Sequence, residues 1–296
     1  MRLDDSAFVT EFSRLAQPAL RVQSGDTVTL RTRDCYMNNL RAPADPRGPA
    51  DGPAIGCNPA TGPIYVSGAR PGDALMCEVL AIDVGGYATM RVGPGAGFMK
   101  HHLSETSVRA FDLRSGAAAL CGAAVPLDPM IGVIGVAPAG FPVDTATPGS
   151  HGGNMDTRVI RAGSVVYLPV ACDGALLALG DVHAQMGDGE VAICGLECPA
   201  DVTVRLTGLP GRAEPWPVVI STEGVSCVCS AETLDQAARL AADAMFMFLL
   251  RRTEMGRNEI AMLMSLACDL AICQVVDPLL TVRMTLRQGV LPGLTY

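Results

Sequence analysis

Alternating apolar and polar positions that follow tight turns predict short β-strands over most of the chain. The segment RVQSGDTVTLRTRD (21–34) has a Ser-Gly turn and then places Val28 and Leu30 on one face. GARPGDALMCEVLAID (68–83) and RAGSVVYLPV (161–170) show the same order of turn and strand. Because 32 Gly and 21 Pro are spread along the chain, residues 1–220 are expected to form a sandwich or barrel of many short strands.

The apolar spacing becomes helical near the C-terminus. Ser230 is expected to cap a first helix that has Glu232 in its first turn and ends at Gly256, and 257–270 is expected to form a second helix. The first helix has apolar residues at helical spacing, namely Leu234, Ala237, Ala238, Ala241, Met245, Phe248 and Leu249. This apolar C-terminal region also suggests a homo-oligomer.

The expected fold class is therefore mainly β, sandwich- or barrel-like with many short strands, followed by a C-terminal α-helical portion. We expect a β-rich N-terminal part over 1–115. The second part, 116–296, is expected to contain the polar motifs described below and the C-terminal helices. The two parts are expected to pack as one compact unit.

Composition limits the partners and the compartment. The chain of 296 residues has a formal charge of -8 and a pI near 5.0, and it lacks the Lys/Arg cluster typical of nucleic-acid-binding proteins. It shows neither a secretory signal in MRLDDSAFVT nor an apolar run of about 20 residues. We expect a cytoplasmic protein with no nucleic-acid or membrane partner. The 11 cysteines, an odd number, are expected to be reduced thiols, most of them buried.

Several common catalytic motifs are absent from the sequence. There is no G-x-S-x-G and no Walker loop, and GPGAGF (93–98) does not have the G-x-G-x-x-G spacing, so it is interpreted as a turn. Lys100 is the single lysine, so a lysine base or Schiff base would have to use it. Lys100-His101-His102 is interpreted as a solvated loop. A nucleophilic cysteine remains open, and the sequence does not rank the cysteines.

The segment LALGDVHAQMGDGEVAICGLE (177–197) gathers ionisable residues within an apolar stretch. On a strand, Asp181 and His183 point to the same side because they are two residues apart. The Gly-Asp-Gly turn at 187–189 is expected to bring a second strand, VAICGLE, back alongside, with Glu197 at its end. Buried carboxylates are costly unless they are paired, so the acids either lie at the surface or surround a cation.

A cation at this place is one of two open interpretations. Zinc accepts imidazole nitrogen and carboxylate oxygen, and Asp156 of HGGNMDTR (151–158) is a further candidate ligand. The alternative is that D-x-H occurs by chance, with Asp188 serving turn chemistry. Glu190 is either an exposed strand residue or a general base.

Five stretches of the sequence resemble the acetamidase/formamidase family. They occur in the expected order and cover nearly the whole chain: GCNPATGPIYVSGARPGDALMCEVLAI (56–82), IGVIGVAPA (131–139), HGGNMDTR (151–158), LPVACDGALLALGDVHAQMGDGE (168–190) and LACDLAICQVVDP (266–278). The GGNMD and GDxHxxxGDGE patterns are the specific ones. The residues at 171–173, 194–198 and 100–102 depart from the family, which leaves the substrate open.

The resemblance implies a mainly β architecture with a helical C-terminal portion, hydrolysis of a small amide to a carboxylate and ammonia, and a divalent-metal centre. Carried onto this sequence, the first motif matches at Asn154 and Asp156. The second motif matches at Asp181, His183 and Glu190, and Glu197 matches the acidic position that closes it.

From these residues we hypothesise that a metal-activated water attacks the amide. The expected metal ligands are Asp156, Asp181, His183 and Glu197, with zinc preferred and calcium the alternative. Glu190 is expected to shuttle the proton. Asn154, or a backbone N–H of 152–153, is expected to donate to the oxyanion.

His183 itself is expected to take part in catalysis, either as a metal ligand or as an acid–base group.

Other classes of protein remain open. The first alternative is a hydrolase of a cyclic amide, an imide or another non-peptide C–N bond. The second is a non-catalytic β protein that binds a small ligand around a structural cation, and the third is a structural oligomer.

Overall fold

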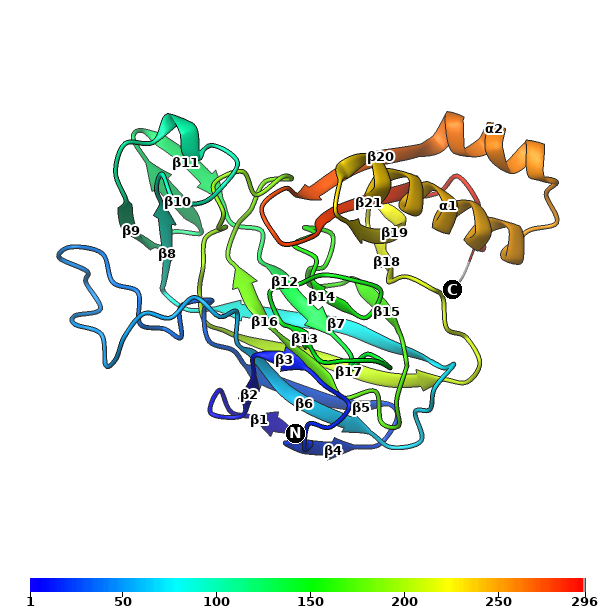
Figure 1. The fold of residues 1–296 in the computed structure, drawn as a ribbon, viewed down its shortest axis with the longest axis horizontal. Helices are drawn as coiled ribbons and strands as arrows, with labels where there is room; N and C mark the ends of the chain where they lie inside the picture. Colours follow the sequence, from blue (N-terminus) through cyan, green and yellow to red (C-terminus); the bar gives the residue numbers. More distant parts are fainter. Residues whose placement is uncertain (295) are drawn as a thin grey trace.

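The computed structural model describes residues 1–294 and 296, and its centre is a sandwich of two β-sheets (Figure 1). The larger sheet has nine strands, and all neighbouring pairs are antiparallel except the first. In spatial order its strands are β1 (Arg2–Leu3), β5 (Asp26–Arg31), β17 (Ala200–Leu209), β7 (Ala74–Val84), β15 (Val165–Pro169), β18 (Val218–Ser221), β19 (Gly224–Ala231), β21 (Leu280–Arg287) and β20 (Cys268–Gln274). The three predicted turn–strand units are confirmed as β5, β7 and β15.

The second sheet has six strands and contributes most of the site described below. Its strands in spatial order are β14 (Gly152–Asn154), β12 (Met130–Gly135), β16 (Leu177–His183), β6 (Ala60–Val66) and β2 (Phe8–Val9), and β4 (Leu20–Val22) also pairs with β6. All of β12, β14 and β16 are buried, so these strands have no alternation of exposed and buried faces. Their continuous apolar and glycine-rich sequences fit that position.

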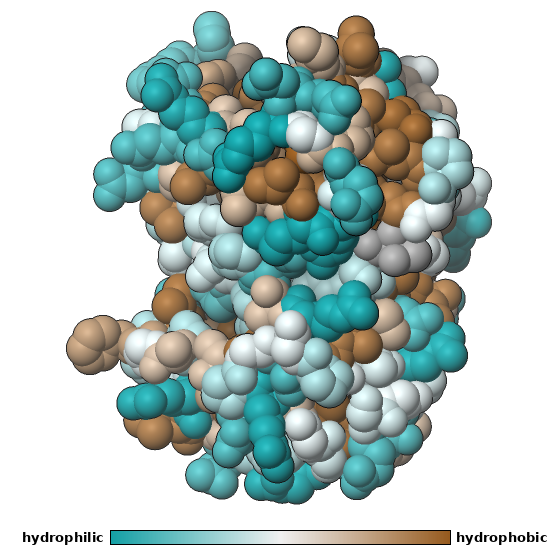
Figure 2. All heavy atoms as spheres, turned by 90° about the vertical axis from the view of Figure 1, so that its right-hand side faces the viewer, coloured by the Kyte–Doolittle hydropathy of each residue, from teal (hydrophilic) through white to brown (hydrophobic). Residues whose placement is uncertain are grey.

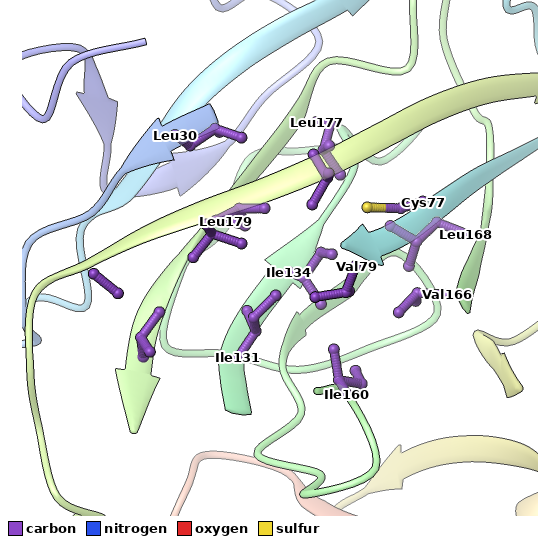
Figure 3. Packing of buried hydrophobic residues seen from close by; sticks show 14 of the residues in the cluster. Leu30, Cys77, Val79, Ile131, Ile134, Ile160, Val166, Leu168, Leu177 and Leu179 are labelled. Atoms are coloured by element: carbon purple, nitrogen blue, oxygen red, sulfur yellow. The ribbon is translucent and has the colours of Figure 1, made fainter. Parts of the chain in front are cut away.

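The main hydrophobic core lies between the two sheets. Figure 3 shows Leu177 and Leu179 of β16 on one side of it, and Val79 of β7 and Val166 of β15 on the other. Leu177 and Leu179 are two residues apart on β16, as are Leu75, Cys77 and Val79 on β7, so these alternating positions face the core. The core contains residues from 1–115 and from 116–296.

Three short two-stranded pairs complete the β structure. They are β8 (Tyr87–Val92) with β9 (Ser107–Asp112), β10 (Ala117–Leu120) with β11 (Ala123–Pro126), and β3 (Glu11–Phe12) with β13 (Val143–Asp144). The loop between β8 and β9 contains a short 3-10 turn, η1 (Lys100–His102), whose three residues are exposed. The solvated position predicted for these residues is confirmed.

Two helices, α1 (Leu234–Arg252) and α2 (Arg257–Ala267), cover the end of the large sheet formed by β19, β21 and β20. The side of α1 that faces the sheet is the predicted one, with Ala237, Ala241, Met245, Phe248 and Leu249 all buried. The mainly β fold with a C-terminal helical portion is thus confirmed.

The predicted helix ends were partly wrong. Thr233, not Ser230, caps α1, because Ser230 lies in β19 and its hydroxyl pairs with that of Thr281 across the sheet. Gly256 begins α2 rather than ending α1. The second helix ends at Ala267, and the apolar residues that follow form edge strand β20.

The C-terminal lobe, defined as α1, α2 and β20, presents apolar side chains to its surroundings. Figure 2 views the molecule from this side, and hydrophobic residues lie among polar ones over its upper half. Met262 and Leu266 on α2 are 65% and 78% exposed, and Leu270 on β20 is 52% exposed. Among the described residues, neither helix is long and apolar enough to cross a membrane.

Candidate functional site

The C-terminal end of β16 carries the first two candidate residues. Asp181 and His183 are both buried, with His183 the last residue of the strand. In Figure 1 this end of β16 lies between the β8–β11 hairpins and the C-terminal lobe. The two side chains lie close together, since Nε2 of His183 is 3.6 Å from Oδ1 of Asp181. The sequence prediction that they lie on one side of the strand agrees with this distance.

Asp156 reaches the same place from the other side of β12. Strand β14 pairs with β12 at Asn154 and Val133, and the chain then turns so that the Asp156 N–H donates to Gly132 O. Gly132 makes room for the acids. A Cβ built at 132 would collide with Asp156 Oδ1 and lie 3.1 Å from Asp181 Oδ2. A glycine at this position therefore lets two carboxylates pack against the sheet.

Glu197 is held by backbone pairing on both sides. Its backbone exchanges hydrogen bonds with Thr89 of β8 (2.9 and 3.1 Å) and forms an antiparallel bridge with His183. Gly195 fits below the imidazole, because a Cβ at that position would lie 2.6 Å from His183 Cγ. The predicted strand at 191–197 does not form, since this segment is a loop with isolated bridges. Glu197 nevertheless lies beside His183.

Glu190 follows the Gly-Asp-Gly turn, which is anchored to strand β20. The N–H of Gly189 donates to Cys273 O at 2.8 Å, and the N–H of Val275 donates to Gly189 O at 3.1 Å. Both terminal nitrogens of buried Arg283 donate to the Asp188 carboxylate, at 2.7 and 2.8 Å. The turn thus connects the β sandwich to the C-terminal lobe and fixes the backbone before Glu190.

The four acids surround one imidazole. Asp156 Oδ1 lies 3.9 Å from His183 Nδ1, on one side of the ring. Glu197 Oε1 and Glu190 Oε1 lie 3.1 and 4.0 Å from Nε2, on the other side, together with Asp181. The structure therefore brings together all the predicted metal-ligand candidates and the predicted proton shuttle.

Three of these carboxylate residues have an unusual backbone. The φ angles of Asp156, Asp181 and Glu190 are 41°, 52° and 46°, in the left-handed region. Such a conformation costs on the order of 1 kcal/mol or more for a residue with a Cβ, and it persists when the surrounding structure imposes it. Three residues with this backbone conformation lie in one cluster. The fold therefore holds these side chains in place at the expense of local stability.

The electrostatics of the cluster follow from its burial. Burial raises the pKa of Glu190 and of Asp156 well above their usual values, and neighbouring carboxylates add to the effect. Burial also raises the pKa of Glu197, to about 7, against the opposing effect of His183. For His183 burial lowers the pKa, but Glu197 and Asp181 outweigh it and the net pKa is raised. The acids repel one another and lack a sufficient positive partner.

The hydrogen bonds of the cluster test whether a cation fits. Many buried polar atoms have no partner, namely both carboxylate oxygens of Asp156, one oxygen each of Asp181, Glu190 and Glu197, and both ring nitrogens of His183. Buried polar groups are normally paired, so such a concentration requires an explanation. An imidazole with several carboxylates is a donor set that binds divalent cations. The residues present fit such an ion.

Three further polar residues at the site were not predicted from the sequence. The Asn58 amide donates to Asp181 Oδ2 at 2.9 Å, and the Asn154 amide donates to Asp277 Oδ2 at 3.0 Å. Cys35 offers a buried thiol within 4.8 Å of ligand atoms of Asp181 and Glu197. Cys35, Asn58 and Asp277 lie in loops and turns outside the two polar motifs, so no local pattern singles them out.

A cavity of about 510 Å³ opens onto the cluster. Asn154, Asp181, Glu190, Glu197 and Asp277 line it. Part of its wall is the GPGAGF loop after β8, through Gly93, Gly95 and Ala96, so this turn also borders the site. The cluster is therefore accessible to a small molecule although its side chains are buried.

Comparisons with known proteins agree with this geometry. The sequence profile of the Acetamidase/Formamidase family matches residues 14–141 and 142–287. The acetamidase of Bacillus halodurans has a TM-score of 0.91 and 42% identity, with 97% of each chain covered. A protein of Thermoanaerobacter tengcongensis, described as a predicted acetamidase/formamidase, has a TM-score of 0.92 and 38% identity, with 98% of this chain and 96% of that chain covered.

A formamidase of Methylophilus methylotrophus is 45% identical over 51 residues, a segment that covers 17% of this chain and 12% of that protein. The family match and the shared fold place the chain among amidohydrolases that act on carbon–nitrogen bonds other than peptide bonds. The chain belongs to the acetamidase/formamidase family.

Proposed function

We propose that this protein hydrolyses small linear amides of the formamide or acetamide type to a carboxylate and ammonia. One observation carries the proposal: several buried carboxylates with unpartnered oxygens surround one imidazole at the wall of a cavity large enough for such a substrate. The names of the similar proteins, acetamidase and formamidase, support the same substrate class.

We infer that a divalent cation binds at this cluster, held by His183 with Asp156, Asp181 and Glu197. When bound, it would polarise the amide carbonyl and lower the pKa of a water molecule. Zinc is the preferred ion because the set contains an imidazole and lies next to a thiol, whereas calcium takes oxygen ligands in larger number. The unpartnered ring nitrogens of His183 support this choice.

The remaining residues account for substrate orientation and proton transfer. Glu190 lines the cavity and is assigned the proton shuttle, which accepts a proton from water and delivers it to the leaving nitrogen. Its raised pKa favours this role, because a carboxyl that holds a proton near neutral pH can also release it to nitrogen.

Asn154 is assigned the oxyanion donor. Its amide nitrogen already donates to Asp277, which leaves its second N–H free to point elsewhere. The N–H of Gly152 donates to Gly149 O and is therefore not the donor. Asp277 orients the amide of Asn154 toward the cavity that both residues line.

The test combines metal analysis with ammonia release. Protein purified without added metal should contain a divalent cation. It should release ammonia from formamide or acetamide, and removal of the cation with a chelator should abolish turnover until zinc is restored. Full activity after metal removal would disprove the metal-dependent mechanism.

Two other outcomes separate the competing classes. Opening of a cyclic amide without ammonia release, together with inactivity on linear amides, would assign the protein to ring-opening hydrolysis instead. A tightly held calcium ion with no turnover on either panel would indicate a binding protein.

We also propose that the chain forms a homo-oligomer through the C-terminal lobe. The exposed side chains of Met262, Leu266 and Leu270 support this, because apolar patches of this kind are often covered by a partner. Light scattering of the purified protein tests it. Wild-type protein should exceed the monomer mass, and Leu266→Glu should reduce it to the monomer mass.

A further inference from the structure

The metal-binding atoms at the site fall into two groups that share no residue. Asp156, His183 and Glu190 offer ligand atoms that all lie within 4.8 Å of one another, and so do Cys35, Asp181 and Glu197. All six residues are buried. The groups adjoin, since Nε2 of His183 is 3.1 Å from Glu197. A tetrahedral zinc ion takes four ligands, fewer than the six side chains that the two triplets offer.

We propose that the site holds a second divalent cation, bound by Cys35, Asp181 and Glu197 beside the first. This inference rests on the proposed function, because it assumes the first cation at His183 and Asp156 and keeps Glu190 as the proton shuttle. Asp181 and Glu197, the other two ligands proposed above, are shared with the second ion, and Cys35 adds a thiolate ligand. The Cys35 thiolate makes zinc, rather than calcium or magnesium, the fitting ion at this second position.

The hydrogen bonds of the two carboxylates carry the argument. Asp181 accepts from the Asn58 amide through Oδ2, and its Oδ1 has no partner. Glu197 accepts from the Gly195 N–H through Oε1, and its Oε2 has no partner. In each case one oxygen is anchored by a protein donor while the other remains free and buried. This is the arrangement of a metal-ligating carboxylate whose orientation is fixed by an outer hydrogen bond.

The segment that carries Cys35 is also held firmly. Asp34 Oδ1 accepts from the N–H groups of Tyr36 and Asn38, at 3.0 and 2.6 Å, and the Asn38 side-chain oxygen accepts from the Asp34 N–H. The N–H of Cys57 donates to Cys35 O at 3.1 Å. These bonds enclose Cys35 on both sides, so its thiol is presented to the carboxylates by a rigid loop rather than by a mobile one.

Charge balance favours two ions over one. Asp156, Asp181, Glu190, Glu197 and Asp277 all line or adjoin the cavity, and with the Cys35 thiolate their formal charge when ionised is six negative units. One divalent ion balances two of these charges and a pair balances four. Because unbalanced buried charges are costly, the second ion relieves half of the repulsion that the first leaves around His183.

Cobalt substitution and metal counting test the proposal. The purified protein is stripped, loaded with Zn²⁺ or Co²⁺ and freed of excess, and the ratio of metal to protein is measured by mass spectrometry. We expect two ions per chain, and the Co²⁺ form should show a thiolate-to-cobalt charge-transfer absorption in the near ultraviolet. Cys35→Ala should bind one ion and lose this absorption. Cys121→Ala, which removes an exposed thiol in a turn, should keep both.

The outcomes separate this proposal from the proposed function. One ion per chain that is retained in Cys35→Ala, with no thiolate absorption in wild type, would overturn the second site and leave the single-ion mechanism intact. Failure of wild type to bind any ion would overturn both. If Cys35→Ala does not fold, Cys35→Ser keeps the side-chain size, and the absorption of wild-type protein decides the question without a variant.

Discussion

The carboxylate of Asp156 and the imidazole of His183 lie 3.9 Å apart, although they belong to separate segments of the chain. Strand β12 explains this distance. It pairs on one edge with β14, which leads into Asp156, and on the other edge with β16, which ends at His183. If the two residues had lain on opposite sides of the molecule, the metal-centre hypothesis would have failed.

Replacing His183 with Ala should remove the cation proposed at His183 and Asp156, together with turnover. The ring is the one imidazole within the cluster, and its loss leaves only oxygen and sulfur ligands. Metal content and ammonia release are measured on the same preparation, with His102→Ala, at an exposed position, as the control. If turnover is lost while the cation stays bound, His183 acts as an acid–base group rather than as a ligand.

Replacing Gly132 with Ala should weaken metal binding and destabilise the fold. The added methyl group collides with Asp156 Oδ1 and with the backbone oxygen of Asp181 at 2.8 Å. Overpacking of this kind costs about 1–3 kcal/mol. Urea unfolding and metal content provide the measurements. Gly140→Ala is the control because a methyl group there meets nothing within 4 Å. Equal effects of both variants would contradict the view that Gly132 makes room for the carboxylates.

Replacing Asp188 with Asn should destabilise the protein and reduce turnover. The change removes the charge that faces buried Arg283, in the turn that precedes Glu190. Because Asp188 is partly exposed, we expect a loss of about 2 kcal/mol, less than for a fully buried pair.

The exposed pair of Arg287 and Asp269 is the matched control for this loss. Asp269→Asn should cost clearly less stability than Asp188→Asn, because solvent screens an exposed pair, and it should leave kcat unchanged. Unfolding curves and steady-state kinetics on both variants decide the matter. An Asp188→Asn protein with wild-type stability and kcat would show that the ion pair of Asp188 and Arg283 does not position Glu190.

Replacing Asn154 with Ala should lower kcat by roughly 100- to 1,000-fold, the usual cost of one oxyanion donor. Asn154→Asp should be at least as damaging, because it places a carboxylate beside Asp277. Steady-state kinetics on the preferred amide provide the measurement. A raised KM with unchanged kcat would instead mean that Asn154 binds the substrate and the transition state equally.

Acidification should destabilise the protein partly through His151. Burial lowers the pKa of this imidazole from 6.5 to about 4. The folded state therefore keeps His151 neutral, while the unfolded state takes up a proton as the pH falls below 6.5. The stability that the neutral ring contributes is present above that pH and is lost progressively down to pH 4, by up to about 3 kcal/mol.

The unfolding free energy between pH 7.5 and pH 4 measures this effect. Over that interval His151→Gln should lose less unfolding free energy than wild type does, and the difference should equal the contribution of His151, up to about 3 kcal/mol. His102→Gln, at an exposed position, should behave as wild type. Parallel pH profiles for wild type and His151→Gln would refute the contribution of His151.

Local patterns were reliable where packing and propensity agree. The alternation at Val28 and Leu30 predicted a strand with one buried face, and both residues are fully buried in β5. The same reasoning failed at the helix ends. Ser230 is a good capping residue, but the pairing of β19 with β21 claims it for the sheet, because strand pairing across the fold outweighs a local capping preference.

The sequence by itself determined the β-rich fold with its C-terminal helices and the identity of most polar side chains at the site. Periodicity and the two polar motifs are local properties, and they can be read without knowledge of the chain path. Only the tertiary structure decided that Cys35 and Asp277 join them and that the acids divide into two groups around His183. Those contacts depend on which strands pair and on where loops cross, and such long-range geometry leaves no periodic trace in the sequence.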